Sequence, residues 1–195
     1  VKDHREKAIH CGRKMFHLLA KLNNEVMEEG LEELKIGVGI NTGDVVVGNM
    51  GSDQRFDYTC LGDAVNLSSR LEGQTKEYRV GIIVGEETTK GIEDRFNFVE
   101  LDKIAVKGKK EGVRIFTILD DTSRCANGGD VKHHNTFLSF YRKQHWNRAL
   151  KMIDLNEITY PELKGYYQMM RERIETLKIN RPGKGWDTIY RATSK

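Results

Sequence analysis

The stretch DYTCLGDAVNLSSRLEG, residues 57–73, constrains the fold of this chain more than any other. Its first residues have the composition of a short strand, Leu-Gly-Asp forms a turn, and the rest is predicted as a helix to about Gln74. Asp63 is the predicted cap of that helix. A strand and a helix joined so closely indicate a domain that mixes α and β elements.

Residues 1–119 predict further strands around this unit. The predicted strands span 35–40, 45–51, 54–61, 80–84, 96–106 and 113–119, and a short helix spans 86–92. The last two strands are joined by KGKKEG, a turn that suits a hairpin. Gly37 and Gly39 fall inside a strand, which argues against a dinucleotide fingerprint and for close approach of another backbone or a ligand. This order of elements predicts an α+β fold.

A long helix is predicted at the start of the chain, over residues 1–29, with Gly30 at its end. Its apolar residues recur at steps of three and four, which predicts one buried stripe. The stripe consists of Ala8, Cys11, Met15, Leu18, Leu19, Leu22 and Val26. Because the chain starts at Val1 inside this helical pattern, we expect it to be a piece of a longer protein.

Charge and cysteine usage exclude several classes of protein. Lys and Arg number 32 against 29 Asp and Glu, a net charge of +3 that gives no argument for nucleic-acid binding. No apolar run approaches the ~18 residues of a membrane span, and the start of the given sequence shows no signal-peptide pattern. Cys11, Cys60 and Cys125 are far apart and odd in number, which favours reduced thiols in a cytoplasmic protein. Attachment to a membrane through upstream segments stays open.

The composition changes at residue 120. Residues 120–135 are polar and Gly-rich, and they are predicted as a linker in which His133 and His134 are solvated. A helical pair follows within 136–195, with helices at about 136–155 and 160–178 and an irregular tail anchored by Trp186. The pair resembles one tetratricopeptide unit, which cannot bury its own face. We expect it to pack on the first domain, with docking of a partner protein as the alternative.

Two groups of residues could carry chemistry. Asn66 and Arg70 are four residues apart and share one helix face, where Arg suits phosphate oxygens and Asn could orient a ribose or a phosphate. Lys107 and Lys109 lie in the VKGKK turn and could reach a polyphosphate, although the turn is not a Walker A loop. The competing interpretations are a solvated helix face and an exposed basic hairpin tip.

The order of these segments is more specific than any one of them. INTGDVVVGNMGS is followed by DYTCLGDAVNLSSRLEG and later by VKGKK. Together they resemble the catalytic domain of the class III adenylyl and guanylyl cyclases, with its ferredoxin-like fold, and in particular bacterial members. The resemblance covers residues 1–119, and the linker, helical pair and tail look like extensions found in some bacterial cyclases.

The resemblance implies an adenylate cyclase that makes 3′,5′-cyclic AMP and pyrophosphate from ATP in intracellular signalling. Sites in this family form between two catalytic domains, so it also implies a homodimer. Matched to the family pattern, Asn66 positions the ribose, and Arg70 stabilises charge on the reacting phosphate. Lys107, with Lys109 as its rival, contacts the polyphosphate. Thr59 takes the base-reading position, whereas Cys60 is expected to be a core residue.

The resemblance also implies two metal ions, Mg²⁺ or Mn²⁺, held by two aspartates in the first half of the family domain. That half is missing here, and neither Asp44 nor Asp63 matches the family's metal positions, so no ligand is assigned. This fragment alone is therefore expected to be inactive, with an unpaired hairpin edge. The alternatives are a catalytically inactive nucleotide-binding or regulatory module, and a guanylate cyclase.

Overall fold

A computed structural model of the chain describes residues 2–52, 55–105, 112–119 and 131–191. Its helices are α1 His4–Glu28, α2 Asp63–Tyr78, α3 Glu86–Thr89, α4 Lys132–Arg142, α5 Trp146–Thr159 and α6 Lys164–Ile179. Its strands are β1 Val38–Ile40, β2 Val46–Ser52, β3 Arg55–Leu61, β4 Ile82–Gly85, β5 Asn97–Ala105, β6 Gly112–Leu119 and β7 Tyr190–Arg191, and 3₁₀ turns span Glu93–Arg95 and Pro161–Leu163. The predicted α+β fold is confirmed.

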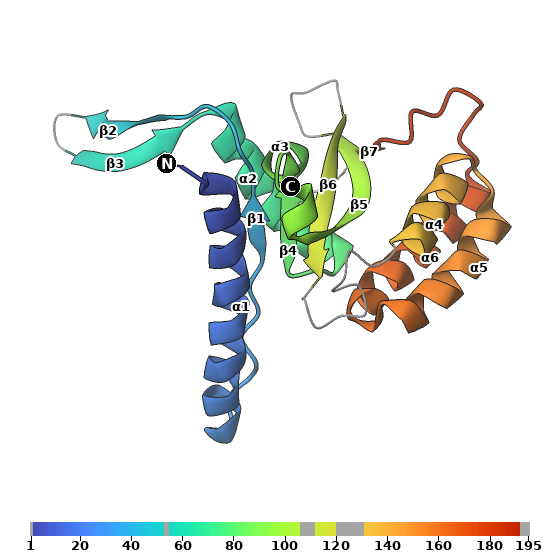
Figure 1. The fold of residues 1–195 in the computed structure, drawn as a ribbon, viewed down its shortest axis with the longest axis horizontal. Coiled ribbons are helices and arrows are strands. Elements are labelled where there is room, and N and C mark those ends of the chain that lie inside the picture. The colour runs from blue at the N-terminus through green and yellow to red at the C-terminus, as the bar shows by residue number, and fades with distance from the viewer. Residues whose placement is uncertain (1, 53–54, 106–111, 120–130, 192–195) are drawn as a thin grey trace.

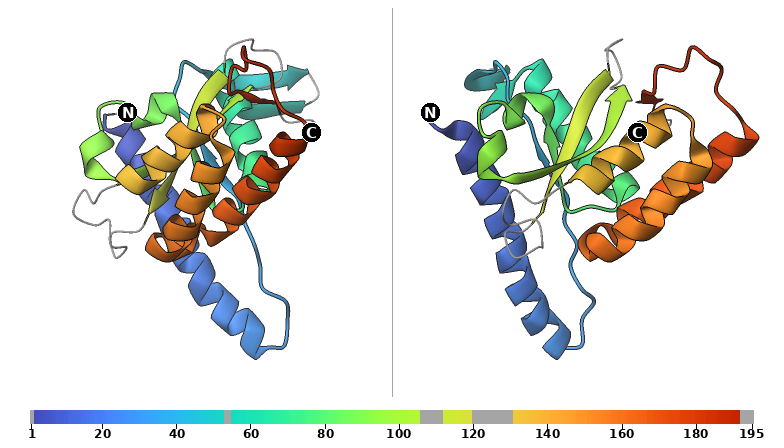
Figure 2. Two further views of the ribbon diagram at one scale, coloured as in Figure 1. Left: turned by 90° about the vertical axis from the view of Figure 1, so that its right-hand side faces the viewer. Right: turned by 45° about the vertical axis from the view of Figure 1, so that its right-hand side comes forward.

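The central sheet has the strand order β1-β4-β6-β5-β7. β1 runs parallel to β4 and β5 parallel to β7, while β4, β6 and β5 pair antiparallel. Helices α2 and α6 pack on one face, and the first half of α1 packs on the other, as the views in Figure 1 and Figure 2 show. The sheet thus separates two apolar cores, and the larger of them takes in the C-terminal helices.

Glycine in β1 lets α2 lie directly against the sheet. A Cβ atom at Gly39 would lie 2.2 Å from the Ser68 carbonyl oxygen and 2.4 Å from the Glu72 backbone nitrogen. The Ser68 hydroxyl donates to the Gly39 carbonyl at 2.8 Å. The interpretation of these glycines as a site of close backbone approach is therefore confirmed, and the approaching backbone is that of α2.

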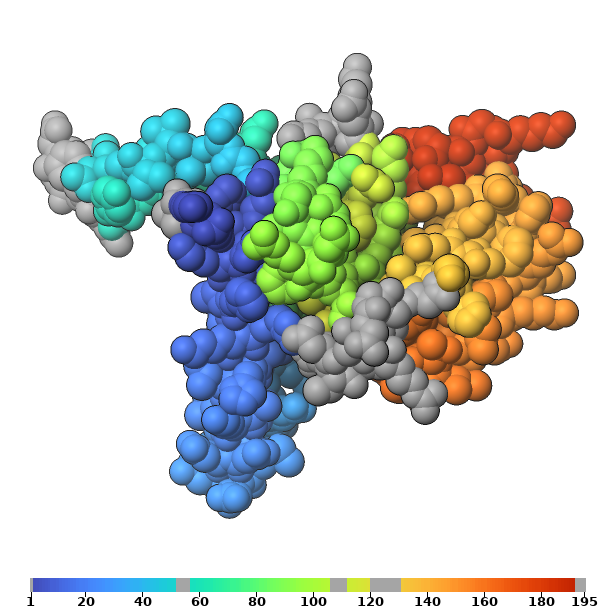
Figure 3. Space-filling model, viewed as in Figure 1, coloured from blue at the N-terminus to red at the C-terminus, as the bar shows by residue number. Residues whose placement is uncertain are grey.

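Strands β2 and β3 form a separate two-stranded hairpin that projects from the body (Figure 1, Figure 3). Its apolar side chains are exposed, with Val46 at 67%, Tyr58 at 76% and Leu61 at 56%. Cys60 is exposed as well, so the expectation that it is a core residue is wrong. Among the residues that the structure describes, no second layer covers these exposed side chains of the hairpin.

Helix α1 is only partly covered. The exposed members of the predicted stripe include Met15, Leu18 and Leu22, at 45%, 51% and 45%. The expectation of one buried stripe is wrong, because only the first half of α1 reaches the sheet and the second half extends away from it (Figure 1). The segment that returns beside it is fixed by Asn23, whose amide exchanges two 2.9 Å hydrogen bonds with the Leu34 backbone.

The C-terminal region differs from the predicted pair of helices. The helix predicted over 136–155 is divided into α4 and α5, with Gln144 in a left-handed conformation (φ 59°) between them. Helix α4 begins at Lys132, inside the range predicted as a linker; residues 120–130 lie outside the described residues. Pro161 opens the turn before α6, as predicted. The division at residue 120 and the tetratricopeptide likeness stay predictions.

These helices pack on the sheet rather than stand apart. Phe137 from α4, Ile153 from α5 and Tyr166 from α6 belong to the same core as Leu71 of α2. Trp186 anchors the tail as predicted, with its ring centroid 5.9 Å from that of Trp146. Within the described ranges, none of the helices has the length and apolar character that a membrane crossing requires.

Candidate functional site

Helix α2 is preceded by a glycine, and any other residue at that position would be strained. Gly62 has φ 155°, and a Cβ atom there would lie 2.9 Å from the Asp44 carbonyl oxygen. Gly62 is the residue before the helix, and Asp63 is its first residue, with no capping hydrogen bond from a side chain. The prediction that Asp63 caps the helix is therefore wrong, although a carboxylate in the first turn still suits the helix dipole.

Asn66 and Arg70 lie one turn apart on α2, and both are exposed. The next strip of the same helix contains Leu67 and Leu71, which are 8% and 0% exposed. The helix is thus fixed along its buried side and presents an amide and a guanidinium along its outer side. The predicted spacing and shared face are confirmed, while the roles of the two side chains stay predictions.

A cavity of about 490 Å³ opens beside the N-terminus of α2. It is lined by Asn41, Thr42, Gly43, Asp44, Asp63, Ala64, Leu67, Glu86, Glu87, Gly112 and Val113. Asn41 donates to the Ala64 carbonyl at 3.1 Å, which ties the loop after β1 to α2. Gly112, the first residue of β6, also lines the cavity, so the start of β6 lies beside the N-terminus of α2.

The acidic residues of this cavity are partly committed to ion pairs. Glu86 accepts hydrogen bonds from Arg114 at 2.5 and 3.1 Å, and these bonds hold the pKa of Glu86 below its ordinary value. Glu87 pairs with Lys90 at 2.5 Å. In the part of the chain that the structure describes, no three His, Cys, Asp or Glu side chains gather to hold a metal ion. These residues do not fit the two-metal site that the family resemblance implies.

The other predicted site residues fall in different places. Thr59 is exposed on β3, opposite Gly48 of β2, on the strand that leads into α2. Lys107 and Lys109 lie outside the described residues, but the hairpin predicted around them is confirmed, since β5 and β6 pair antiparallel up to Ala105 and Gly112. The described lining of the cavity does not include Thr59, Asn66 or Arg70.

A buried charged cluster was not anticipated from the sequence. Asp102 of β5 is 1% exposed and accepts hydrogen bonds from the Tyr78 hydroxyl at 2.7 Å and from Arg173 at 2.5 Å. Burial raises the pKa of Tyr78 well above its ordinary value, and the Asp102 carboxylate adds to the rise. The sequence held one signal for this cluster. Arg173 follows Tyr166 and Met170 at helical spacing, which places it on the apolar stripe of α6.

His134 is buried, which contradicts the expectation that it is solvated. Its Nε2 lies 2.6 Å from the Glu100 carbonyl oxygen, and its Nδ1 lies 2.8 Å from the Tyr167 hydroxyl. A carbonyl can only accept, so Nε2 carries the proton and Nδ1 accepts from Tyr167 in the neutral ring. Burial lowers the pKa of His134 to about 4. The wrong expectation arose because α4 begins before the residue at which the sequence places it.

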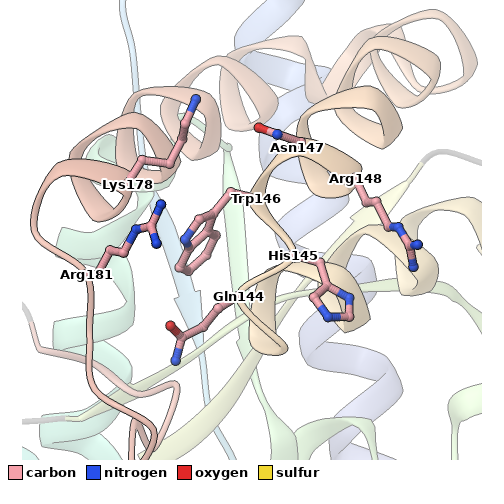
Figure 4. A pocket seen from close by; sticks show the side chains of 7 residues that line it. All are labelled: Gln144, His145, Trp146, Asn147, Arg148, Lys178 and Arg181. Carbon is pink, nitrogen blue, oxygen red and sulfur yellow. The ribbon is translucent and has the colours of Figure 1, made fainter.

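A second cavity, of about 610 Å³, lies between α5 and the end of α6 (Figure 4). Its lining includes His145, Arg148, Lys178 and Arg181. Several of its side chains are already engaged: Lys178 pairs with Glu175, Arg148 stacks on Phe140, and Trp146 contacts Trp186. Figure 4 shows Arg148 and His145 turned away from Arg181, so the basic groups do not converge on one point. Its lining includes none of the predicted site residues that the structure describes, Thr59, Asn66 and Arg70.

The family model for the adenylate and guanylate cyclase catalytic domain matches residues 1–120. The chain therefore belongs to that family. The match covers both segments of the predicted site, the β2–β3 hairpin with α2 and the hairpin of β5 and β6.

Proteins of similar sequence are consistent with this family assignment. The chain is 36% identical over 118 residues to an adenylate cyclase of Anabaena cylindrica. The matched region covers 57% of this chain and 24% of that protein. It is 32% identical over 155 residues to the terminal-differentiation-specific adenylate cyclase of Dictyostelium discoideum. That match covers 75% of this chain and 7% of that protein. Since 75% of the chain is more than residues 1–120 supply, that alignment reaches into the region after them. The chain thus spans less than a quarter of either relative.

Solved structures give the same fold. The adenylyl cyclase CyaB from P. aeruginosa superposes with a TM-score of 0.56 at 34% identity, covering 62% of this chain and 62% of that one. The guanylyl cyclase Cya2 superposes with a TM-score of 0.54 at 34% identity, covering 60% of this chain and 59% of that one. An adenylyl and a guanylyl cyclase are therefore equally similar in sequence to this chain.

Proposed function

We propose that this chain supplies the ribose-, phosphate- and base-contacting half of an adenylate cyclase site. The reaction is the conversion of ATP to 3′,5′-cyclic AMP and pyrophosphate in intracellular signalling, in the cytoplasm. The observation that carries the proposal is the exposed strip of α2, where Asn66 and Arg70 are held on a helix whose neighbouring strip is buried. Membership of the cyclase family supports it.

The chemistry of the strip suits cyclisation. Arg70 is permanently charged and presents planar donors to phosphate oxygens, so it would stabilise the charge that develops on the reacting phosphate. Asn66, one turn earlier, has an amide that would orient the ribose for attack by its 3′ oxygen. Exposure of both side chains suits a substrate that approaches from outside this chain, as it would at an interface with a second cyclase domain.

The polyphosphate would be met by Lys107, with Lys109 as the alternative. Support comes from the described residues that follow that turn. Gly112 and Val113, which follow it, line the same cavity as Asp63 and Ala64 at the start of α2. A basic turn attached there would approach the phosphates from the side of the sheet, while Arg70 approaches from α2.

The choice of ATP over GTP depends on Thr59. Its hydroxyl can both donate to and accept from an adenine edge. Overall similarity does not decide the base, because an adenylyl and a guanylyl cyclase match at the same identity. A guanylate cyclase is the alternative, and the ratio of turnover with ATP to turnover with GTP distinguishes the two. Preference for GTP would overturn the assignment of Thr59.

A second cyclase domain, in a homodimer, would complete the site. The described residues gather no metal-binding cluster, so the two Mg²⁺ or Mn²⁺ ions would be held by residues from outside them. When bound, the ions would activate the 3′ oxygen and the α-phosphate. The exposed apolar side chains of the β2–β3 hairpin and α1 offer surface for such an association. On this proposal the chain alone is inactive.

The test uses the natural polypeptide that contains this chain, assayed for cyclic nucleotide formation. Asn66→Ala should lower kcat by about 100-fold, the usual effect of losing a positioning or electrostatic contact. Ser69→Ala, an exposed change on the same helix, is the matched control and should leave turnover unchanged. Near-normal turnover in Asn66→Ala would contradict the ribose role.

A regulatory nucleotide-binding module is the competing proposal, and the lack of a metal-binding cluster among the described residues favours it. It predicts that ATP binds the natural polypeptide while no cyclic product forms with Mg²⁺ or Mn²⁺. Product formation that is sensitive to Asn66 excludes it. The C-terminal helices already pack on the sheet, which supports packing within the chain over docking of a partner protein.

A further inference from the structure

Helix α2 has two ends of opposite character. Its first turns present Asn66 and Arg70 to solvent, whereas its last residue, Tyr78, is 0% exposed. Arg79 then ends the helix in a left-handed conformation, with φ 53°. What holds the buried end therefore contributes to the position of the exposed strip, together with the burial of Leu67 and Leu71, because the helix is continuous from Asp63 to Tyr78.

The buried end is held by groups from the C-terminal region. The Tyr78 hydroxyl donates to Asp102 Oδ2 at 2.7 Å, and Arg173 Nη1 of α6 donates to the same oxygen at 2.5 Å. The Arg173 guanidinium also lies over the Tyr78 ring at 5.2 Å and over the Tyr190 ring at 3.8 Å. Tyr190 in turn donates to Glu77 of α2 at 3.1 Å. Residues from α6 and β7 thus surround the last turn of α2.

A bulge in β5 creates this meeting point. The pairing of β5 with β6 shifts between Glu100 and Asp102, so Leu101 is an extra residue in the strand. Leu101 and Asp102 are consequently both buried, although successive residues of a regular strand point to opposite faces. The carbonyl oxygen of Glu100 binds His134, and that of Leu101 accepts from the Tyr166 hydroxyl at 2.7 Å. Helices α4 and α6 therefore dock on the bulge itself.

A buried ion pair is a poor device for stability alone, because desolvation of its charges offsets most of their attraction. Arg173 and Asp102 are 10% and 2% exposed at their side chains. Apolar packing could join the same elements as firmly. A carboxylate that accepts hydrogen bonds from fixed donors on two different helices permits one orientation of α2 relative to α6. Apolar contacts do not impose one orientation.

We propose that Arg173, Asp102 and Tyr78 form a positioning cluster through which the C-terminal helices set the placement of Asn66 and Arg70. The cluster touches no substrate and acts through α2. The proposal rests on the proposed function to the extent that α2 is taken as the helix that contacts the nucleotide. It gives residues 131–191 a part in the reaction that the cyclase match over residues 1–120 does not include.

The test compares two buried tyrosine hydroxyls that make hydrogen bonds of the same length, one to a carboxylate and one to a backbone carbonyl. Tyr78 and Tyr166 are both 0% exposed, and each makes a 2.7 Å hydrogen bond, Tyr78 to Asp102 and Tyr166 to the Leu101 carbonyl. Tyr78→Phe removes the hydrogen bond from α2 to Asp102 and keeps the ring beneath Arg173, whereas Tyr166→Phe removes a bond of the same length that does not involve α2. Both keep the ring, so both are expected to fold.

Hydrogen–deuterium exchange on the 195-residue chain gives the first readout. The backbone amides of residues 67–72 should exchange about fivefold faster in Tyr78→Phe than in Tyr166→Phe, the effect of losing one buried hydrogen bond. Equal exchange of α2 in the two variants would overturn the proposal, whatever the activity of the protein.

The second readout is turnover in the natural polypeptide. Tyr78→Phe should lower kcat about tenfold with little change in KM, and Tyr166→Phe should leave both unchanged. Arg173→Lys should retain more of kcat than Arg173→Met. If Asn66→Ala lowers turnover while the two tyrosine variants remain equal, the positioning cluster is refuted and the proposed function stands. If Asn66→Ala has no effect, the proposed function fails and exchange alone decides the role of the cluster in holding α2.

Discussion

Helices α1 and α6 have similar apolar periodicity but different surroundings. Helix α6 buries five of its sixteen residues, namely Tyr166, Tyr167, Met169, Met170 and Ile174. Helix α1 is twenty-five residues long and buries only Ile9, Gly12 and Asn23. The difference lies in their neighbours, because α6 packs among α2, α5 and β5, while α1 reaches the sheet over its first half only. Periodicity shows that a helix has an apolar face, and the rest of the fold determines whether that face is covered.

The polar residues of the two helices differ in the same way. Asn23 of α1 binds the backbone of the adjacent returning segment, a local contact. Arg173 of α6 binds a carboxylate on β5 and stacks on rings from α2 and β7. The contacts of α6 thus connect distant parts of the sequence, and we expect changes in α6 to cost far more than changes in α1.

The largest effect is expected at the centre of the α6 contacts. Asp102→Ala leaves the Arg173 charge buried without its partner, which should lower the free energy of unfolding by about 4 kcal/mol. Urea denaturation of the chain measures this. Asp102→Leu combined with Arg173→Met removes both charges and should recover most of the loss. If Asp102→Ala were as stable as the wild type, the ion pair would not be buried.

A direct comparison of apolar residues on the two helices comes next. Ile174→Ala in α6 removes a side chain that is 0% exposed and should cost about 3 kcal/mol. Leu18→Ala in α1 trims a side chain that is 51% exposed and should change stability by less than about 0.5 kcal/mol. Equal losses in the urea midpoints of the two variants would mean that the face of α1 is covered in solution.

Burial of His134 predicts a pH dependence of stability. Its folded pKa of about 4 lies below the ordinary value of about 6.5, so the unfolded chain binds the extra proton between these values. The contribution is fully present above pH 6.5 and is lost as the pH falls, by about 2.5 kcal/mol between pH 7 and pH 4.5. His134→Gln should flatten this slope in urea titrations, and His133→Gln, an exposed neighbour, should not. Identical slopes would refute the burial of the ring.

The smallest effect is expected where α2 and α6 meet at the surface. Arg79 and Glu172 pair at 2.8 Å, with side chains 41% and 64% exposed. They adjoin Tyr78 and Arg173 in sequence, yet solvent screens their attraction, so Arg79→Ala should cost less than about 1 kcal/mol. High salt should abolish even that difference. A loss comparable to that of Asp102→Ala would erase the contrast between the buried and exposed pairs.

Much of the structure of residues 1–119 could be predicted from the sequence, because the signals there are local. The strand–turn–helix unit, the strip of Asn66 and Arg70, the hairpin of β5 and β6 and the close approach at Gly39 all follow from residue type and spacing. Helix α2 nevertheless continues to Tyr78 rather than to about Gln74. Its last turn is stabilised by contacts with β5 and α6 that local sequence does not encode.

The errors about burial share one cause, the dependence of burial on neighbours far away in sequence. Cys60 and several members of the α1 stripe have the residue types of a core, yet they are exposed among the residues that the structure describes. His134 has the residue type of a surface, and the bulge of β5 buries it. Asp102 looks like an ordinary strand carboxylate until the bulge turns it inward beside Leu101.

The central claim is that the exposed strip of α2 contacts the reacting nucleotide, and the most direct test compares two arginines on that helix. The natural polypeptide is assayed for cyclic nucleotide formation with Arg70→Ala and with Arg79→Ala, which truncates an exposed arginine at the opposite end. The account predicts that Arg70→Ala lowers kcat by about 100- to 1,000-fold and that Arg79→Ala stays near the wild type. Equal turnover in the two variants would contradict it.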